Sequence, residues 1–466
     1  MNRTKKLFSN SAIFVVANMG SKLISFIMVP LYSYYLSTKE FGTVDLILTT
    51  VNLFLPVVSL SLYDAVFRFI MDKSTKHSKI LSTAFYSILL LSIFLGGIIS
   101  CFDFLQRDYL VLFSVILSMS SIFSMFQNYV RASGKSKVFA LSGVLNTVIF
   151  AIFNVILIII INLGVLGYLI SYLAAIFISI LYLFFHEHLW KYIKLKNYSL
   201  IELKQMLKYS LPLIPNSLAW WFTNDASKFF ILMFVGISGN GLFAVANKLP
   251  SIVNMFFNVF SQAWQISAID EFSSEDGAEY ISKVLKYLIG VQVILIASFM
   301  LILQPFMKIL FSSQYFEAWK YVPLMLISVL FANLSAFLGT MYLAAKKTTA
   351  IFTTTVVGMV VNVLFSYFLT PIFGITGTCL GVVFGFAVVV VIRIIDVKKI
   401  IEIKLEWNKL LISIVVILVM NASLLISNNL IKYSMVIICY LCIIVIHFFI
   451  VKKIKKAALK IMAKLN

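Results

Sequence analysis

Charged residues are scarce in this chain. Asp, Glu, Lys and Arg make up 12% of the 466 residues, whereas hydrophobic residues make up 61%. A soluble domain of this length could not bury so much apolar surface. No polar stretch is long enough to form a soluble domain, and apolar runs of about 20 residues, the length that crosses a bilayer, recur from end to end. The composition therefore predicts an all-α integral membrane protein.

Cysteine and histidine are also rare, with four of each. Cys439 and Cys442 form a C-x-x-C pair inside an apolar run without a second pair, which indicates packing in lipid rather than a metal or redox site. His186 and His188 flank Glu187 at the end of a predicted helix, and we interpret this triplet as a solvated terminus. No group of residues in the sequence indicates a catalytic site, so the chain is not predicted to be an enzyme.

The apolar runs predict about 14 membrane spans. Their limits are 9–36, 42–70, 80–102, 109–132, 138–161, 165–185, 209–235, 241–269, 284–311, 321–344, 348–370, 376–396, 409–428 and 433–451. The first run follows three basic residues, as in a signal peptide, but it is longer than a signal peptide's apolar region. We therefore expect an uncleaved first span.

The distribution of basic residues predicts the orientation of these spans. Of the 38 Lys and Arg residues, 28 lie in predicted loops and ends on the side of the amino terminus, and 5 lie on the other side. Because basic loops stay in the cytosol, both termini are expected to be cytosolic. The formal net charge of +20 is therefore mainly a topology signal. The basic residues are dispersed over many short loops, which disfavours nucleic acid as a partner.

The sequence repeats weakly with an offset of about 210 residues. Gly164-Val-Leu-Gly167 precedes the sixth span, and Gly374-Ile-Thr-Gly377 precedes the twelfth. Six spans in each half give a parallel repeat. We expect an N-lobe over 1–200 with six spans, a C-lobe over 201–400 with six spans, and two further spans with a basic cytosolic tail over 401–466. Two six-helix lobes with a site between them is a transporter architecture.

Polar residues gather on one face of the first, second, seventh and eighth spans, which are equivalent in pairs under the repeat. At about 100° per residue, seven residues of the eighth span share an arc: Asn247, Ser251, Asn254, Asn258, Ser261, Gln262 and Gln265. Such faces either hydrogen-bond neighbouring helices or line a cavity that binds sugar hydroxyls. Three tryptophans could stack on sugar rings or simply pack: Trp220, Trp221 and Trp264.

Five cations lie inside predicted spans, where a charge at mid-bilayer costs roughly 2.5–3.5 kcal/mol. They are Lys22, Arg68, Lys228, Lys248 and Arg393. Lys22 shares the polar face of the first span with Asn18 at mid-membrane depth, so it is the strongest candidate to bind a phosphate. Lys228 and Lys248 lie at similar depth, off the polar faces. Arg393 is expected to snorkel to the cytosolic surface.

Two carboxylates accompany these cations. Asp225 lies three residues before Lys228, a spacing that allows an intrahelical ion pair or exchange of H⁺ or Na⁺ during transport. Asp64 lies one turn before Arg68, near the predicted cytosolic end of the second span. Prolines occur in the same four spans as the polar faces and mark expected hinges. They are Pro30, Pro56, Pro212, Pro215 and Pro250.

The chain resembles the Wzx-type polysaccharide flippases, in the polysaccharide transporter family of the MOP exporter superfamily. The resemblance rests on spans arranged as six, six and two, on Glu40-Phe41-Gly42, on Tyr63-x4-Arg68 and on the Gly374 turn. It implies that the first, second, seventh and eighth spans line a central cavity. It also implies transport of an undecaprenyl-pyrophosphate-linked oligosaccharide across the bacterial cytoplasmic membrane, for O-antigen or capsule, with no cofactor.

The expected substrate-binding residues are Lys22, Asn18, Arg68, Asn247, Lys248, Asn254, Asn258, Gln265, Trp220 and Lys228, with Asp225 and Asp64 as candidates for H⁺ or Na⁺ coupling. The expected partners are the lipid-linked oligosaccharide, membrane lipids, a polysaccharide polymerase and other assembly proteins. The alternatives are a lipid II flippase of the same superfamily, a MATE-type drug or cation antiporter, and a membrane polysaccharide polymerase. A MATE-type antiporter would favour an acidic cavity, and a polymerase would favour a large outer loop.

Overall fold

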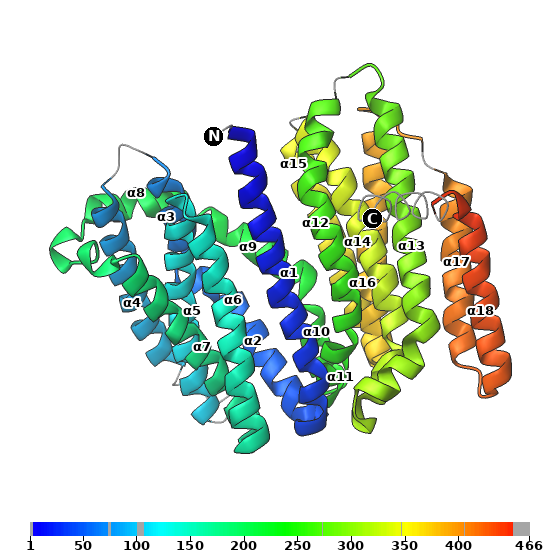
Figure 1. Ribbon diagram of the computed structural model, residues 1–466, viewed down its shortest axis with the longest axis horizontal. Coiled ribbons are helices and arrows are strands. Elements are labelled where there is room, and N and C mark those ends of the chain that lie inside the picture. The colour runs from blue at the N-terminus through cyan, green and yellow to red at the C-terminus, as the bar shows by residue number, and fades with distance from the viewer. Residues whose placement is uncertain are drawn as a thin grey trace, which may run out of the picture. The chain divides into compact units, whose positions relative to one another are not determined.

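The computed structural model describes residues 3–72, 76–99, 107–272, 274–345, 347–404 and 406–450 (Figure 1). These residues form helices joined by short turns, and no strand occurs among them. The predicted all-α membrane fold is therefore confirmed. The chain divides into two compact units, Met1–Ala226 and Ser227–Asn466. The predicted division into two lobes and a carboxyl-terminal part, with limits at 200 and 400, stays a prediction.

Unit 1, residues 1–226, contains nine α-helices and three short helical turns among its described residues. They are α1 (Arg3–Tyr35), α2 (Thr38–Val58), α3 (Leu62–Ile70), α4 (His77–Ile99), α5 (Arg107–Ala132), α6 (Ser136–Asn154), the π-helical turn η1 (Val155–Ile160), α7 (Gly164–His186), the 3-10 turns η2 (Leu189–Lys191) and η3 (Leu195–Asn197), α8 (Leu200–Ser210) and α9 (Leu213–Asn224). The short helix α3 packs against α4, α5 and α8, and α6 packs against α1 and α7. Met125 and Phe126 of α5 are buried at the centre of this core.

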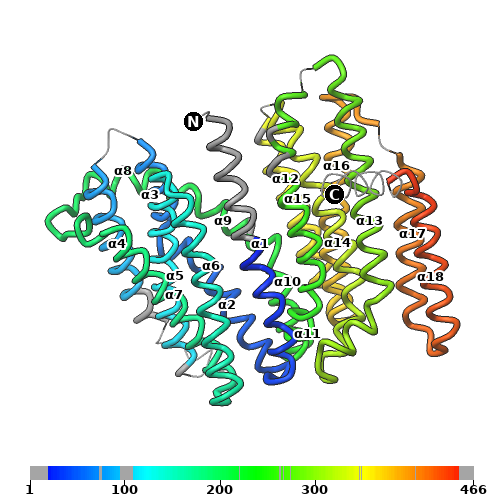
Figure 2. The backbone as a smooth tube through the Cα atoms, in the orientation of Figure 1, coloured from blue at the N-terminus to red at the C-terminus, as the bar shows by residue number. Residues whose placement is uncertain are grey.

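Unit 2, residues 227–466, contains the remaining helices. They are α10 (Ser227–Phe234), α11 (Ile237–Ala246), α12 (Lys248–Glu271), α13 (Gly277–Leu310), the 3-10 turn η4 (Ser313–Lys320), α14 (Val322–Ala344), α15 (Thr348–Phe373), α16 (Ile375–Val397), α17 (Trp407–Leu424) and α18 (Asn429–Ile446). Helix α14 is the central helix and packs against α12, α13 and α16. The hairpin of α17 and α18 packs on α13, where Gln304 Nε2 donates to Leu424 O over 2.9 Å (Figure 2).

Each predicted span corresponds to one helix or to two consecutive helices. Eleven of the described helices are long and apolar enough to cross a membrane, or up to twelve spans if α11 and α12 form one bent span. The first predicted span corresponds to α1, whose side chains are described only from Met19 onward. The seventh corresponds to α9 and α10, each of which is short.

Three of the four proline-bearing spans are broken, and two of these breaks lie within five residues of a proline. The second span breaks between α2 and α3, where Leu60 and Ser61 both adopt φ of 49°. The eighth bends by 42° between α11 and α12, three residues before Pro250. The seventh is divided into α9 and α10 after Asn224, far from Pro212 and Pro215 at the start of α9. Helix α1, in contrast, continues through Pro30. A proline removes one helix hydrogen bond, which lowers the cost of a break nearby.

The two glycine turns of the predicted repeat share a positive φ at their first glycine. Gly164 and Gly374 adopt φ of +55° and +59°, which side-chain-bearing residues rarely adopt. Each turn is followed by a second glycine that approaches the preceding helix closely. A Cβ on Gly167 would lie 3.0 Å from Leu157 O, and a Cβ on Gly377 would lie 2.1 Å from Leu369 O. The sequence match between the halves therefore reflects a positive-φ glycine and a close helix approach that both turns share.

Gly377→Ala tests this close approach. The added methyl group would overlap Leu369 O and force α15 and α16 apart, so we expect a loss of about 2 kcal/mol in the free energy of unfolding. The measurement is thermal unfolding of the detergent-solubilised protein. Gly143→Ala is the control, because a Cβ at Gly143 would meet nothing within 4 Å. Equal melting temperatures for the two variants would contradict the expectation.

Candidate polar membrane site and buried charges

Helix α12 presents a polar face and a buried apolar face. Five of the predicted polar residues are exposed on it: Asn247, Ser251, Asn254, Asn258 and Gln265. Leu249, Val253 and Ala268 are buried on the other side, where α12 packs against α14. The side chain of Gln262 lies outside the described residues. A membrane-length helix that exposes five polar groups can offer hydrogen bonds to a polar ligand.

The bend at the start of α12 supports this polar face. Asn247 caps both helices at the bend, and its backbone N–H donates to Phe243 O over 2.9 Å. The next turn begins with Ser251 N–H donating to Asn247 O. Lys248 is the first residue of α12 and is half-buried. The exposed amide of Asn247 and the ammonium of Lys248 are thus adjacent in sequence at the bend.

Two of the three tryptophans are packing residues. Trp264 is 3% exposed, stacks on Phe337 with a centroid separation of 4.6 Å and donates from Nε1 to Thr340 Oγ1. Trp221 is buried, and its Nε1 donates to Thr49 O over 3.0 Å. Neither ring face is free to stack on a sugar, so packing is the correct interpretation for both. The side chain of Trp220 lies outside the described residues.

The polar face of α1 is only partly accessible. Lys22 and Ser25 are exposed, and Ser25 Oγ donates back to Ser21 O. Tyr32, three turns further along, is buried between Phe41 and Tyr168. The side chain of Asn18 lies outside the described residues. The structure therefore places Lys22 on an exposed surface of a membrane-length helix, whereas the end of this predicted face is core.

The remaining predicted residues lie at helix ends. Arg68 is exposed in the last turn of α3, one turn after the half-buried Asp64. Asp225 caps the carboxyl end of α9 in unit 1 and is half-buried. Lys228 is half-buried in the first turn of α10 in unit 2. Among the side chains that the structure describes, no group of three His, Cys, Asp or Glu could hold a metal ion.

The prediction that Arg393 snorkels to the surface is wrong. Arg393 in α16 is 4% exposed, and its guanidinium donates five hydrogen bonds to α14 and α15. The acceptors are Thr354 Oγ1, Ser335 O, Ser335 Oγ, Ile351 O and Thr355 Oγ1 at 2.7–3.2 Å. Gly339 leaves room for this group, because a Cβ there would lie 3.0 Å from Arg393 Nη1. Arg393 therefore joins three helices of unit 2.

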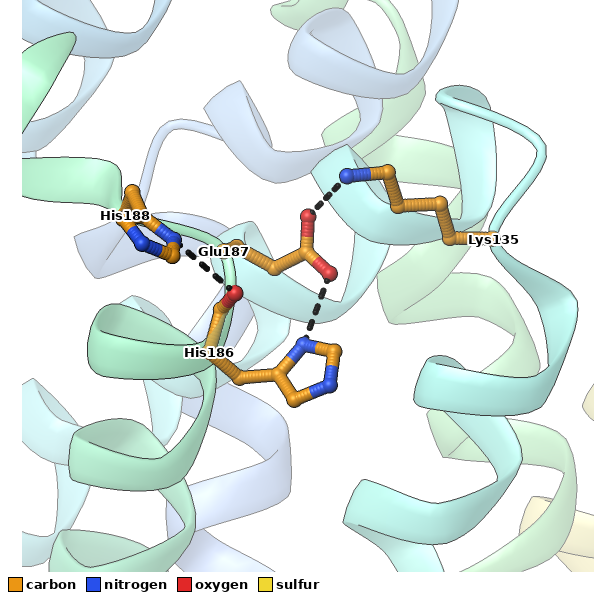
Figure 3. A network of polar contacts seen from close by, with 4 residues as sticks. All are labelled: Lys135, His186, Glu187 and His188. Carbon is orange, nitrogen blue, oxygen red and sulfur yellow. Dashed lines mark hydrogen bonds and ion pairs between the residues drawn. The ribbon is translucent and has the colours of Figure 1, made fainter.

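Both histidines of the predicted solvated terminus at His186 to His188 are exposed, but its central residue is buried. The Glu187 side chain is 2% exposed and accepts from Lys135 Nζ at 2.5 Å, across from the turn between α5 and α6 (Figure 3). His186 Nδ1 lies 3.1 Å from the other carboxylate oxygen. Lys135 and Glu187 are 52 residues apart in the sequence. Local sequence patterns therefore did not show that they form an ion pair.

A comparison with known protein families identifies the family of this chain. The family described as "Polysaccharide biosynthesis protein" matches residues 7–265, which is more than half of the sequence. The chain belongs to this polysaccharide biosynthesis protein family. A relative in Haemophilus influenzae (strain ATCC 51907 / DSM 11121 / KW20 / Rd), named "Lsg locus putative protein 1", is 24% identical over 264 residues. That match covers 55% of this chain and 65% of the relative, so the chain spans less than two thirds of the relative's length.

Solved structures with the same fold come from the MOP superfamily. The inward closed conformation of the lipid II flippase MurJ matches with a TM-score of 0.70 over 93% of this chain and 98% of that chain, at 14% identity. The inward-facing conformation of a multidrug resistance MATE family transporter matches with a TM-score of 0.59 over 86% and 96%, at 15% identity. These likenesses confirm the MATE/MOP-like fold that the sequence predicted.

Arg393→Ala tests the role of the buried cation in this family member. The variant loses five charged hydrogen bonds and leaves their buried acceptors unpaired. We therefore expect the free energy of unfolding to fall by about 3 kcal/mol. Arg393→Lys should recover part of it, because an ammonium keeps the charge but not the planar geometry. The readout is the melting temperature of purified protein, with Lys399→Ala as the control, since Lys399 is exposed near the end of the same helix. An unchanged melting temperature for Arg393→Ala would refute this role.

Proposed function

We propose that the protein is a flippase that moves an undecaprenyl-pyrophosphate-linked oligosaccharide from the cytosolic to the outer leaflet of the bacterial cytoplasmic membrane. The exposed polar face of α12 carries this proposal, because amides and hydroxyls suit the hydroxyl groups of an oligosaccharide. Membership of the polysaccharide biosynthesis protein family gives the substrate class its support. No step of covalent chemistry is needed.

The proposed cycle uses the charged and polar residues in separate roles. Lys22 and Arg68, both exposed, attract the pyrophosphate from the cytosolic leaflet. Asn254, Asn258 and Gln265 bind the sugars, assisted by Asn247 and Lys248, while the polyprenyl chain stays in lipid. The breaks between α2 and α3 and between α11 and α12 act as hinges for alternating access. Ion coupling through Asp225 or Asp64 would drive the cycle.

The second candidate substrate is lipid II, favoured by the TM-score of 0.70 to the MurJ structure. Both substrates share a polyprenyl pyrophosphate and differ in their sugars. An antiporter of organic cations is disfavoured, because the exposed residue at mid-length of α1 is Lys22, which would repel a cation. The match to the polysaccharide family over residues 7–265 favours the oligosaccharide substrate over lipid II. A polysaccharide polymerase and other assembly proteins are the partners that would receive the transported unit.

Lys22→Ala is expected to slow transport without loss of the protein from the membrane. A charged hydrogen bond contributes about 1.5–3 kcal/mol, so the transport rate should fall roughly tenfold or more. The measurement is the fraction of lipid-linked oligosaccharide accessible at the outer leaflet in a deletion strain that carries each variant. Lys22→Arg should retain most transport, and Lys39→Ala is the control at an exposed lysine. Normal accessibility in the deletion strain itself would exclude the flippase function.

The double variant Asn254→Leu with Asn258→Leu tests the sugar-binding face of α12. Each lost neutral hydrogen bond costs about 0.5–1.5 kcal/mol, so we expect a combined reduction of roughly tenfold in oligosaccharide transport. Phe256→Leu is the matched control, because Phe256 is exposed on the same helix and apolar. Transport by the double variant at the rate of the control would remove this face from the proposed site.

A further inference from the structure

Unit 1 contains an apolar groove that the proposed transport cycle does not use. The groove has a volume of about 750 Å³ and lies between α4 and the segment from η3 to α8. One wall is formed by Leu90 and Ile93 of α4, and the other by Leu195, Leu203 and Leu207. Pockets that bind small ligands have volumes of roughly 300–1,000 Å³, so the groove is large enough for part of an amphiphile.

Hydrogen bonds attach the groove's second wall to the amino-terminal part of α4. Ser82 Oγ donates to Tyr192 O over 2.8 Å and accepts from Lys194 N–H. Thr83 Oγ1 accepts from Ser199 N–H over 3.1 Å, one residue before α8 begins. Figure 2 shows α8 beside α3 and α4 in unit 1. The groove therefore begins next to these hydrogen bonds of Ser82 and Thr83 and continues along the apolar face of α4.

One polar group in the groove has no partner. Ser87 lines the groove and is 8% exposed, and its buried Oγ makes no hydrogen bond within the described part of the chain. A hydroxyl left unpaired in an apolar site costs about 1–3 kcal/mol. Because this Oγ has almost no accessible surface, the wall that Ser87 presents to the groove is apolar.

The segment that forms the groove's second wall is basic in sequence. Lys194 and Lys196 flank the lining residue Leu195, and Lys204 and Lys208 follow Leu203 and Leu207. All four lysines are exposed, and none forms an ion pair with another residue that the structure describes. Glu202 is the only acidic residue from 191 to 208. A helix with apolar residues on one side and lysines on the other is typical of an anionic membrane surface.

We propose that the groove binds an anionic phospholipid, with an acyl chain along α4 and the head group on the lysines of η3 and α8. The apolar walls exclude a soluble anion as the ligand, and the exposed lysines next to the lining residues of η3 and α8 select an anionic over a zwitterionic head group. In the proposed orientation the lipid comes from the cytosolic leaflet. Leu60, at the break between α2 and α3, also lines the groove, so the bound chain contacts a predicted hinge.

Native mass spectrometry of the purified full-length protein tests the proposal with phosphatidylglycerol and phosphatidylethanolamine of identical acyl chains. The wild type should retain phosphatidylglycerol roughly tenfold more strongly than phosphatidylethanolamine. Leu203→Trp should fill the groove and lose one bound phosphatidylglycerol. Its control is Leu200→Trp, because Leu200 is 71% exposed on the same helix and does not line the groove.

A lysine variant tests the head-group site without altering the packed core. Lys194→Gln, Lys204→Gln and Lys208→Gln together should abolish the preference for phosphatidylglycerol, whereas Lys137→Gln, Lys398→Gln and Lys404→Gln should preserve it. Equal lipid retention by Leu203→Trp and Leu200→Trp would overturn the proposal. So would displacement of the lipid by undecaprenyl phosphate, which would assign the groove to the substrate's chain. None of these lipid-binding outcomes depends on transport activity.

Discussion

In the hydrocarbon of a bilayer, each backbone N–H and C=O must find a partner within the protein, and this requirement decides where a span can break. The break between α2 and α3 meets it with local groups. Ser61 N–H donates to Pro56 O over 2.9 Å, and Leu62 N–H donates to Ser59 O. Ser59 Oγ adds a bond to Leu55 O over 2.6 Å. The backbone groups at this break are therefore paired mainly with other backbone groups of the same turn.

The same requirement separates the charges of this protein into two kinds. Arg393 and Glu187 are buried and paired. Arg393 donates to groups of α14 and α15, whereas Glu187 accepts from Lys135 in the turn before α6 and lies beside His186 of its own helix. Burying either one without partners would cost several kcal/mol, so these residues stabilise their units. Lys22 and Asn258 are exposed on membrane-length helices and have no side-chain hydrogen bond to another described residue. Groups of this second kind remain available to a polar ligand.

The sequence predicted the helices well because apolar run length depends on local composition. It also predicted the paired turns at Gly164 and Gly374, since positive φ strongly favours glycine. It failed for Arg393 and Glu187 and left the role of Trp264 open, because the environment of all three is set by contacts between distant segments. A helical projection shows which residues share a face, but it does not show whether that face meets another helix. The predicted polar face of α12 is exposed, whereas Tyr32 on the predicted polar face of α1 is buried against other helices.

The groove and the break in the second span are connected through Leu60. A residue other than glycine at a positive φ costs roughly 1–2 kcal/mol. The backbone conformation of Leu60 and Ser61 at the break is therefore strained. A chain bound in the groove would add contacts to Leu60 only while this conformation persists. By linkage, a ligand that binds one conformation shifts the equilibrium toward it. An anionic lipid would thus stabilise the bent form of the span that carries Arg68, which ties membrane composition to the residue proposed to recruit the substrate.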